Sequence, residues 1–252
     1  MRDPAQYARF SDQRSRPFFE LLQRVPQGDF RRIVELGCGS GELTVSLAER
    51  WPEAQVLGLD NSAQMLDKAW QHQIPGRLEF RNGDITDYDE PADLIFTNAA
   101  LQWLDNHQML FPHLTRLLNP GGVLAVQMPY SHVQPSHRLL EDTVRNGPWA
   151  KKLEAWHRFR VEPLITYVTL MMGLGCEVDA WETTYHFILQ GQDPVLEWVK
   201  GTSLQPILTL LDEGERGQLT AEYAAKLREA YPPAAVGTVY PFQRIFFIAR
   251  CV

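Results

Sequence analysis

The sequence predicts a doubly wound α/β fold, in which helices cover a mostly parallel sheet of seven strands. Short runs rich in Val, Ile and Leu alternate with helical stretches, as βαβ units of a parallel sheet do. Three alternate glycines, Gly37, Gly39 and Gly41, directly follow the first apolar run. Acidic residues then end or follow the next apolar runs, which is typical of open sheets that bind ligands at their carboxyl edge.

The predicted elements follow one another in the order that such a sheet requires. Five strands are expected at 32–36, 55–59, 78–81, 94–97 and 123–128, with helices at 42–50 and 63–71. Asn61 or Ser62 is the expected N-cap of the second helix. Pro120-Gly121-Gly122 breaks the chain before the fifth strand. Two late apolar runs, 177–189 and 244–250, predict two further strands.

The glycine run indicates which class of ligand the sheet binds. Glycine tolerates positive φ and has no Cβ, so the strand can turn sharply while its amides face a ligand. A dinucleotide-binding fingerprint would place its third glycine where this chain has Glu42. That carboxylate would repel a pyrophosphate, whereas the acid Glu35 favours a ligand that carries an ammonium group. The pattern therefore favours a cationic ligand without phosphate.

Two further acids extend this site. Asp60 ends the second predicted strand about 20 residues after the glycines, where the carboxylate can accept both hydroxyls of a ribose. Asp84 follows the third predicted strand, where an adenine amino group can donate to it. With the glycine run and the segments 93–98 and 118–126, these acids resemble the class I S-adenosylmethionine-dependent methyltransferases in order and spacing.

The resemblance implies a Rossmann-like methyltransferase sheet and S-adenosyl-L-methionine as the methyl donor, with S-adenosyl-L-homocysteine as product. It also implies that the last two strands form an antiparallel hairpin at the edge of the sheet. The cofactor-binding residues implied in this way are Tyr7, Glu35, Gly37, Gly39, Asp60, Asn61, Asp84, Ile85 and Asn98.

The segment after the fourth strand bears on the methyl acceptor. It reads Asn98-Ala99-Ala100-Leu101-Gln102-Trp103 and lacks the Asp/Asn-Pro-Pro-Tyr pattern of methyltransferases that act on amines of DNA bases. Metal-dependent methylation of a catechol would need clustered carboxylates near this edge of the sheet. No such cluster can be assembled from the nearby acids, so we expect no metal. A carboxylic acid with a pKa near 4 is already ionised at neutral pH. Such an acceptor needs no catalytic base, only proximity and orientation.

A closer resemblance covers nearly the whole chain. Segments similar to the trans-aconitate 2-methyltransferase family are 7–17, 98–104, 110–114, 124–129, 175–185, 198–202 and 244–250. The family implies formation of a monomethyl ester of trans-aconitate or a closely related small polycarboxylic acid. Arg14, Gln102, Trp103 and Arg244 are the substrate-binding candidates, because arginines can hold carboxylates with two hydrogen bonds. The chain departs from the family at 145–169, and at Gln205, where an arginine is expected.

Two other functions stay open at this point. A carboxyl methyltransferase for a malonyl thioester on a carrier protein would need a basic docking surface, and no basic cluster is seen outside the long insertions. A non-catalytic S-adenosylmethionine-binding protein would bind the cofactor tightly without turnover.

Length and composition predict one methyltransferase domain over 1–252. Its expected parts are N-terminal lid helices (1–30), a cofactor-binding core (31–129), helical lid insertions (130–172 and 191–235) and edge strands (173–190 and 238–252). Long insertions of this kind usually act as binding lids.

Charge, cysteine spacing and apolar runs indicate which partners and which location to expect. The formal net charge of −7 argues against nucleic acid, although a local arginine pocket can still hold a small polycarboxylate. Cys38, Cys176 and Cys251 lack paired spacing, so neither a zinc site nor a disulfide is expected. Without a bilayer-spanning apolar run or a signal peptide, no membrane association and a cytoplasmic location are expected. The oligomeric state stays open, and a monomer is compatible with the sequence.

Overall fold

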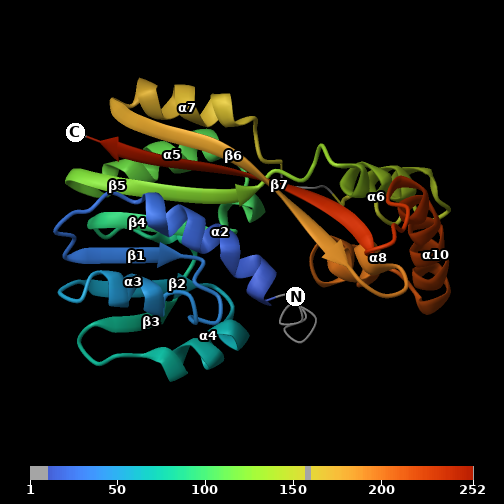
Figure 1. Cartoon of the computed structure of the whole chain (residues 1–252), viewed down its shortest axis with the longest axis horizontal. Helices are drawn as coiled ribbons and strands as arrows, with labels where there is room; N and C mark the ends of the chain where they lie inside the picture. Colours follow the sequence, from blue (N-terminus) through green and yellow to red (C-terminus); the bar gives the residue numbers. More distant parts are fainter. Residues whose placement is uncertain (1–10, 157–159, 252) are drawn as a thin grey trace. The chain divides into compact units, whose positions relative to one another are not determined.

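The predicted seven-stranded sheet is confirmed. The computed structural model describes residues 11–156 and 160–251, and its strands lie in the order β3-β2-β1-β4-β5-β7-β6 (Figure 1). The strands are β1 Arg32–Leu36, β2 Gln55–Asp60, β3 Leu78–Asn82, β4 Ala92–Asn98, β5 Leu118–Pro129, β6 Cys176–Leu189 and β7 Thr238–Cys251. The pairs β1–β2, β1–β4, β2–β3 and β4–β5 are parallel. The last strand β7 pairs with β5 in the antiparallel sense, from Val123↔Arg250 to Pro129↔Arg244.

The helices lie between and after these strands. The α-helices are α2 Ser11–Arg24, α3 Val45–Arg50, α4 Ala63–Ala69, α5 His107–Arg116, α6 Pro135–Asn146, α7 Leu164–Gly173, α8 Pro194–Val199, α9 Gln205–Leu208 and α10 Glu213–Ala230. Short 3-10 turns are η1 Trp70–His72, η2 Ile85–Asp87 and η3 Leu101–Trp103, and η4 Lys200–Leu204 is a π-helical turn.

Two predicted helix boundaries need correction. The helix expected at 42–50 begins only at Val45, because Gly41 has a φ of +77° and keeps the turn open beyond the glycines. The helix expected at 63–71 ends as an α-helix at Ala69 and continues as the tighter turn η1. Its predicted cap is confirmed, since Ser62 Oγ accepts a hydrogen bond from the Met65 amide.

The chain divides into two compact units. One unit comprises Ser15–Pro129, Val161–Thr183 and Arg244–Val252, and contains most of the sheet. The other includes Tyr130–Arg160 and Thr184–Gln243. Helix α7 therefore groups with the sheet, although all but its last residue falls within the segment 130–172, for which the sequence predicts a lid insertion.

A buried polar network organises the unit that contains 184–243. Helices α6 and α10 pack against each other there, and Ser136 on α6 is fully buried. Its amide donates to the Tyr231 hydroxyl at 3.0 Å, and its carbonyl accepts from the Tyr223 hydroxyl at 2.9 Å. Its own hydroxyl lies 3.1 Å from that of Tyr240. Because these buried groups have partners, the network favours one defined packing of this unit.

Within the unit that contains most of the sheet, aromatic contacts and hydrogen bonds fix helix α2 against the strands. The Phe18 ring on α2 lies 4.9 Å from the Phe96 ring on β4. Glu20 accepts hydrogen bonds from Trp181 Nε1 and from the Thr183 hydroxyl on β6. Trp181 in turn stacks on Phe246 of β7 at 5.0 Å. Helix α2 is thus tied to a central strand and to both strands at one edge of the sheet.

The expectation that the cysteines stay unpaired is wrong for two of them. Cys176 begins β6 and Cys251 ends β7, and the two form a disulfide with Cα atoms 4.1 Å apart. Sequence spacing gave no sign of this bond, because 75 residues separate the two cysteines. Only the pairing of the two edge strands brings them together.

In the described part of the chain, no helix combines the length and apolar character needed to cross a bilayer.

Reduction of this disulfide is expected to lower the free energy of unfolding by about 4 kcal/mol, because the bond closes a long loop in the unfolded chain. Denaturant unfolding of the oxidised protein with and without a reductant measures the change. The double variant Cys176→Ser/Cys251→Ser is the control, and reductant should leave its stability unchanged. An oxidised wild type whose unfolding midpoint ignores the reductant would contradict the expectation.

Candidate active site

The carboxyl ends of neighbouring parallel strands gather the polar side chains of the candidate site. Glu35 lies on β1, Asp60 on β2, Asn98 on β4 and Gln127 on β5. Asp84 follows β3 by two residues. Strand order reverses between β1 and β4, and ligands of open α/β sheets bind at the carboxyl edge beside such a switch point. The predicted acids Glu35, Asp60 and Asp84 and the amide Asn98 thus lie where a ligand of this fold is expected.

The three glycines of the turn after β1 differ in what surrounds them. All have positive φ, at +79° for Gly37, +58° for Gly39 and +77° for Gly41. A Cβ at Gly37 would lie 2.3 Å from the Ala100 Cβ, and one at Gly41 would lie 2.7 Å from the Phe80 ring. A Cβ at Gly39 would meet no atom of the described residues within 4 Å. Two glycines therefore allow close packing, while the third leaves open space beside the backbone.

Asp60 holds this turn in place. Its Oδ2 accepts from the Gly39 amide and its Oδ1 from the Ser62 amide, both at 2.9 Å. The carboxylate therefore lies directly beside the open glycine, where a ligand that passes Gly39 also reaches Asp60.

Asp84 is held by the turn η2. Its Oδ1 accepts from the Thr86 hydroxyl at 2.6 Å and from the Thr86 amide at 2.9 Å. These hydrogen bonds lower the pKa of Asp84 below its usual range. Asn61 Nδ2 donates to its other oxygen at 3.4 Å, and the Ile85 side chain lies 3.8 Å from the Cβ position of Gly37. Asn61 and Ile85 therefore adjoin the acid and the glycine turn respectively.

Glu35 is the most deeply buried acid of the group. Only 3% of its surface is exposed, and its Oε2 has no hydrogen-bond partner among the described residues. Burial raises the pKa of Glu35 to about 7, with Thr44 opposing the rise and the charge of Asp60 adding to it. A buried carboxyl group with an unpaired oxygen can be satisfied by a cationic ligand.

The segment after β4 packs against the glycine turn. Ala99 has a φ of +54°, which is uncommon for a residue with a Cβ. Its amide donates to the Gln127 carbonyl at 3.0 Å, and its own carbonyl accepts from Gln102 Nε2 at 2.8 Å. Gln102 and Trp103 lie half-buried in η3. Since a Cβ at Gly37 would collide with Ala100, this segment lies directly against the glycine turn.

Arg244 lies on β7 beside the end of β5. It is 5% exposed, and its backbone pairs with Pro129. Its Nη1 donates to Gln127 Oε1 at 3.1 Å. Gln127 is fully buried and was not singled out from the sequence. The available signal was a lone amide in the apolar run Leu124-Ala125-Val126-Gln127-Met128.

Two predicted residues cannot be placed in this site. Tyr7 lies outside the described residues, and Arg14 is described only as part of the backbone of α2. Their proposed roles stay predictions. Among residues 11–156 and 160–251, no group of three or more His, Cys, Asp or Glu side chains is arranged to hold a metal ion.

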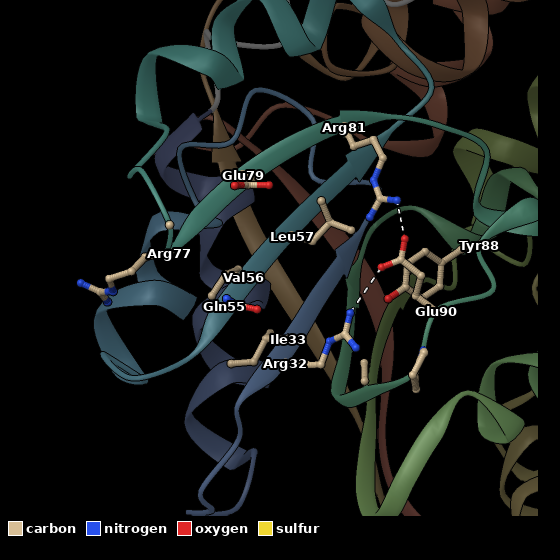
Figure 2. A pocket seen from close by; sticks show the side chains of 13 residues that line it. Arg32, Ile33, Gln55, Val56, Leu57, Arg77, Glu79, Arg81, Tyr88 and Glu90 are labelled. Atoms are coloured by element: carbon tan, nitrogen blue, oxygen red, sulfur yellow. Dashed lines mark hydrogen bonds and ion pairs between the residues drawn. The ribbon is translucent and has the colours of Figure 1, made fainter.

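A separate cavity of about 190 Å³ lies over one face of β1, β2 and β3 (Figure 2). It includes Arg32 and Gln55, which begin their strands, whereas Glu35 and Asp60 lie toward the opposite ends. Glu90 pairs with Arg81 at 2.5 Å and with Arg32 at 3.6 Å, so an acid of the lining binds two of the three arginines that line the cavity. None of the predicted site residues is among the described residues that line it.

The chain is similar to known methyltransferases. Residues 33–122 match a family model described as a methyltransferase domain. A trans-aconitate 2-methyltransferase of Streptomyces avermitilis is 46% identical, with 98% of this chain and 96% of the relative covered. The same enzyme of Methylobacterium nodulans is 45% identical, with 98% and 97% covered. The solved phosphoethanolamine N-methyltransferase 2 of Haemonchus contortus, in complex with S-adenosyl-L-methionine, matches with a TM-score of 0.55 at 17% identity. The match covers 92% of this chain and 51% of that protein, and it shows a shared fold.

Proposed function

Because this chain belongs to the trans-aconitate 2-methyltransferase family, we propose that it methylates a carboxylate of trans-aconitate with S-adenosyl-L-methionine. The products are a monomethyl ester and S-adenosyl-L-homocysteine. The chain and its two compared relatives align over nearly their whole lengths, so the segments on both sides of the glycine turn are shared.

The residues near β1 and β2 suit the methyl donor. When bound, S-adenosyl-L-methionine supplies a methyl group on a sulfonium sulfur, which a nucleophile displaces directly. Open space beside Gly39 gives the donor room against the backbone. The unpaired Oε2 of Glu35 can accept from its ammonium group, and the carboxylate of Asp60 can accept from its ribose hydroxyls.

The remaining cofactor residues surround these three. Asp84, Asn61 and Ile85 are proposed to hold the adenine end, and Asn98 to accept from the amino acid end. Gly37 keeps the turn close to the segment after β4, because a side chain there would collide with Ala100.

Methyl transfer to a carboxylate requires orientation of the acceptor rather than removal of a proton from it. The acceptor is ionised at neutral pH, so no residue is assigned as a catalytic base. Holding it in line with the sulfur can lower the barrier by about 7–11 kcal/mol. We propose that Arg244 binds an acceptor carboxylate and that Gln102 and Trp103 orient the acid beside the glycine turn. The observation that supports this most is a buried guanidinium, 5% exposed, that donates to the Gln127 amide oxygen beside the end of β5.

The function is tested by incubating the purified protein with labelled S-adenosyl-L-methionine and a panel of di- and tricarboxylic acids, then identifying methyl esters by mass. We expect a monomethyl ester from trans-aconitate. Ester formed only from a malonyl thioester would favour the carrier-protein alternative. Tight binding of S-adenosyl-L-methionine without any ester would indicate a non-catalytic binding protein.

Replacing Arg244 with methionine is expected to raise the KM for the acid about tenfold or more, since a charged hydrogen bond to the substrate is lost. The KM for S-adenosyl-L-methionine should change less than threefold. Steady-state kinetics with each substrate varied in turn measure both. If the variant instead loses affinity mainly for S-adenosyl-L-methionine, Arg244 does not belong to the acceptor side.

The other partners follow from charge. A small polycarboxylate rather than nucleic acid is proposed as partner, and the net charge of −7 supports this. The cytoplasmic location expected from the sequence is part of the same proposal.

A further inference from the structure

Three adjacent strands, β1, β4 and β5, each carry a buried side-chain atom without a partner near their carboxyl ends. Glu35 Oε2 on β1 and Asn98 Oδ1 on β4 are acceptors with no partner among the described residues. Gln127 Nε2 on β5 is a hydrogen-bond donor that likewise has no partner among the described residues. The register pairs Glu35 with Phe96 and Asn98 with Gln127, so these side chains come from three strands that are adjacent in the sheet.

This division matches the two reactants of the proposed function. Acceptor oxygens on β1 and β4 suit the cationic methyl donor. A donor nitrogen on β5, next to the guanidinium of Arg244 on β7, suits an anionic acid. The edge of the sheet therefore changes from attracting a cation to attracting an anion between Asn98 and Gln127.

Arg244 fixes the direction of the Gln127 amide. A guanidinium group only donates hydrogen bonds, so the atom 3.1 Å from Arg244 Nη1 must be the oxygen of the amide. The opposite orientation would place two donors against each other. The Nε2 atom is therefore the end of the side chain that stays available, and it is buried where an unpaired donor is costly.

We propose that Gln127 determines acceptor specificity: its Oε1 positions Arg244, and its Nε2 donates to a carboxylate oxygen of the acid. This inference rests on the proposed function. A glutamate at this position would pair with Arg244 and cancel its charge. The neutral amide positions the guanidinium through Nη1 and adds no negative charge beside it.

The test compares Gln127→Glu and Gln127→Met with the wild type. Binding of trans-aconitate to the protein saturated with S-adenosyl-L-homocysteine is measured by calorimetry, and the KM for each substrate by kinetics. Gln55→Glu is the matched control, because Gln55 is exposed on β2 and plays no part in the proposed site. Thermal unfolding and S-adenosyl-L-methionine binding show whether each variant is folded.

Gln127→Met is expected to weaken acid binding about tenfold, and Gln127→Glu to weaken it further. S-adenosyl-L-methionine affinity and the control should stay within threefold of the wild type. A dicarboxylic analogue that lacks the contacted carboxylate should lose less affinity in Gln127→Met than trans-aconitate does. Unchanged acid binding in folded variants, or equal losses for both acids, would overturn the inference.

The proposed function can fail separately. A wild type that binds small polycarboxylates with the expected dependence on Gln127, but forms no ester, would contradict the function and leave the binding role intact. A wild type that methylates trans-aconitate with the same KM as Gln127→Met would contradict only the inference.

Discussion

Replacing Glu35 with glutamine is expected to stabilise the protein without ligand at pH 8 and, at the same time, to weaken its binding of S-adenosyl-L-methionine. The physical reason is that the Glu35 carboxyl group is buried with one oxygen unpaired. Burial raises its pKa from 4.5 to about 7, so ionising it inside the folded protein costs free energy that glutamine avoids. The residue would then be retained for binding at the expense of stability.

The sign of the pH dependence follows from this shift. Between pH 4.5 and about 7 the folded protein holds a proton on Glu35 that the unfolded chain has released. The free energy of unfolding therefore falls as pH rises through this range. The penalty is absent below pH 4.5 and complete above about 7, where it amounts to about 3 kcal/mol at most. The advantage of Glu35→Gln should grow over the same range.

The affinity for S-adenosyl-L-methionine depends on pH in the opposite sense to the stability. A cationic ligand pairs with the ionised carboxylate, so wild-type affinity for S-adenosyl-L-methionine should fall as pH drops below about 7. In Glu35→Gln the affinity should be low and nearly independent of pH. Denaturant unfolding and calorimetric binding from pH 5 to 8 measure both effects. Glu53→Gln is the control, because Glu53 is exposed on the loop before β2. If Glu35→Gln binds as tightly as the wild type at pH 8, Glu35 does not contact the ammonium group.

Features that depend on local pattern could be predicted from the sequence. The mostly parallel sheet and the positions of Glu35, Asp60 and Asn98 follow from apolar runs that end in polar residues, because parallel strands align their carboxyl ends. Features that depend on contacts between distant segments could not. The bond between Cys176 and Cys251 requires the edge strands to meet.

Gln127 shows the same limit at the candidate site. In sequence it is one amide in a buried strand, a position where polar groups usually serve only to satisfy a neighbour. Its importance arises from Arg244, which is 117 residues further along the chain. The predicted helix start at residue 42 differs from the observed start of α3 at Val45 for a local reason. The helical pattern of 42–50 does not show that Gly41 has a positive φ.

The glycine turn provides a matched pair of substitutions with different expected losses. Gly39→Ala and Gly41→Ala both place a Cβ at positive φ, which costs about 1–2 kcal/mol. At Gly39 the new methyl group lies more than 4 Å from every atom in the described part of the chain, but it enters the space proposed for the cofactor. We expect a drop in melting temperature of a few degrees, with S-adenosyl-L-methionine affinity reduced roughly ten- to hundredfold.

At Gly41 the same methyl group would lie 2.7 Å from the Phe80 ring and 2.9 Å from the Ala69 Cβ. Relieving that overlap costs about 1–3 kcal/mol beyond the backbone strain, so Gly41→Ala should lose clearly more stability than Gly39→Ala. Its remaining folded protein should bind S-adenosyl-L-methionine better than Gly39→Ala does, because the new group faces the protein interior. Thermal unfolding and calorimetry on both variants test the pair. If Gly39→Ala keeps wild-type affinity, the cofactor does not approach the backbone at Gly39, and the contact must lie elsewhere along the carboxyl edge of the sheet.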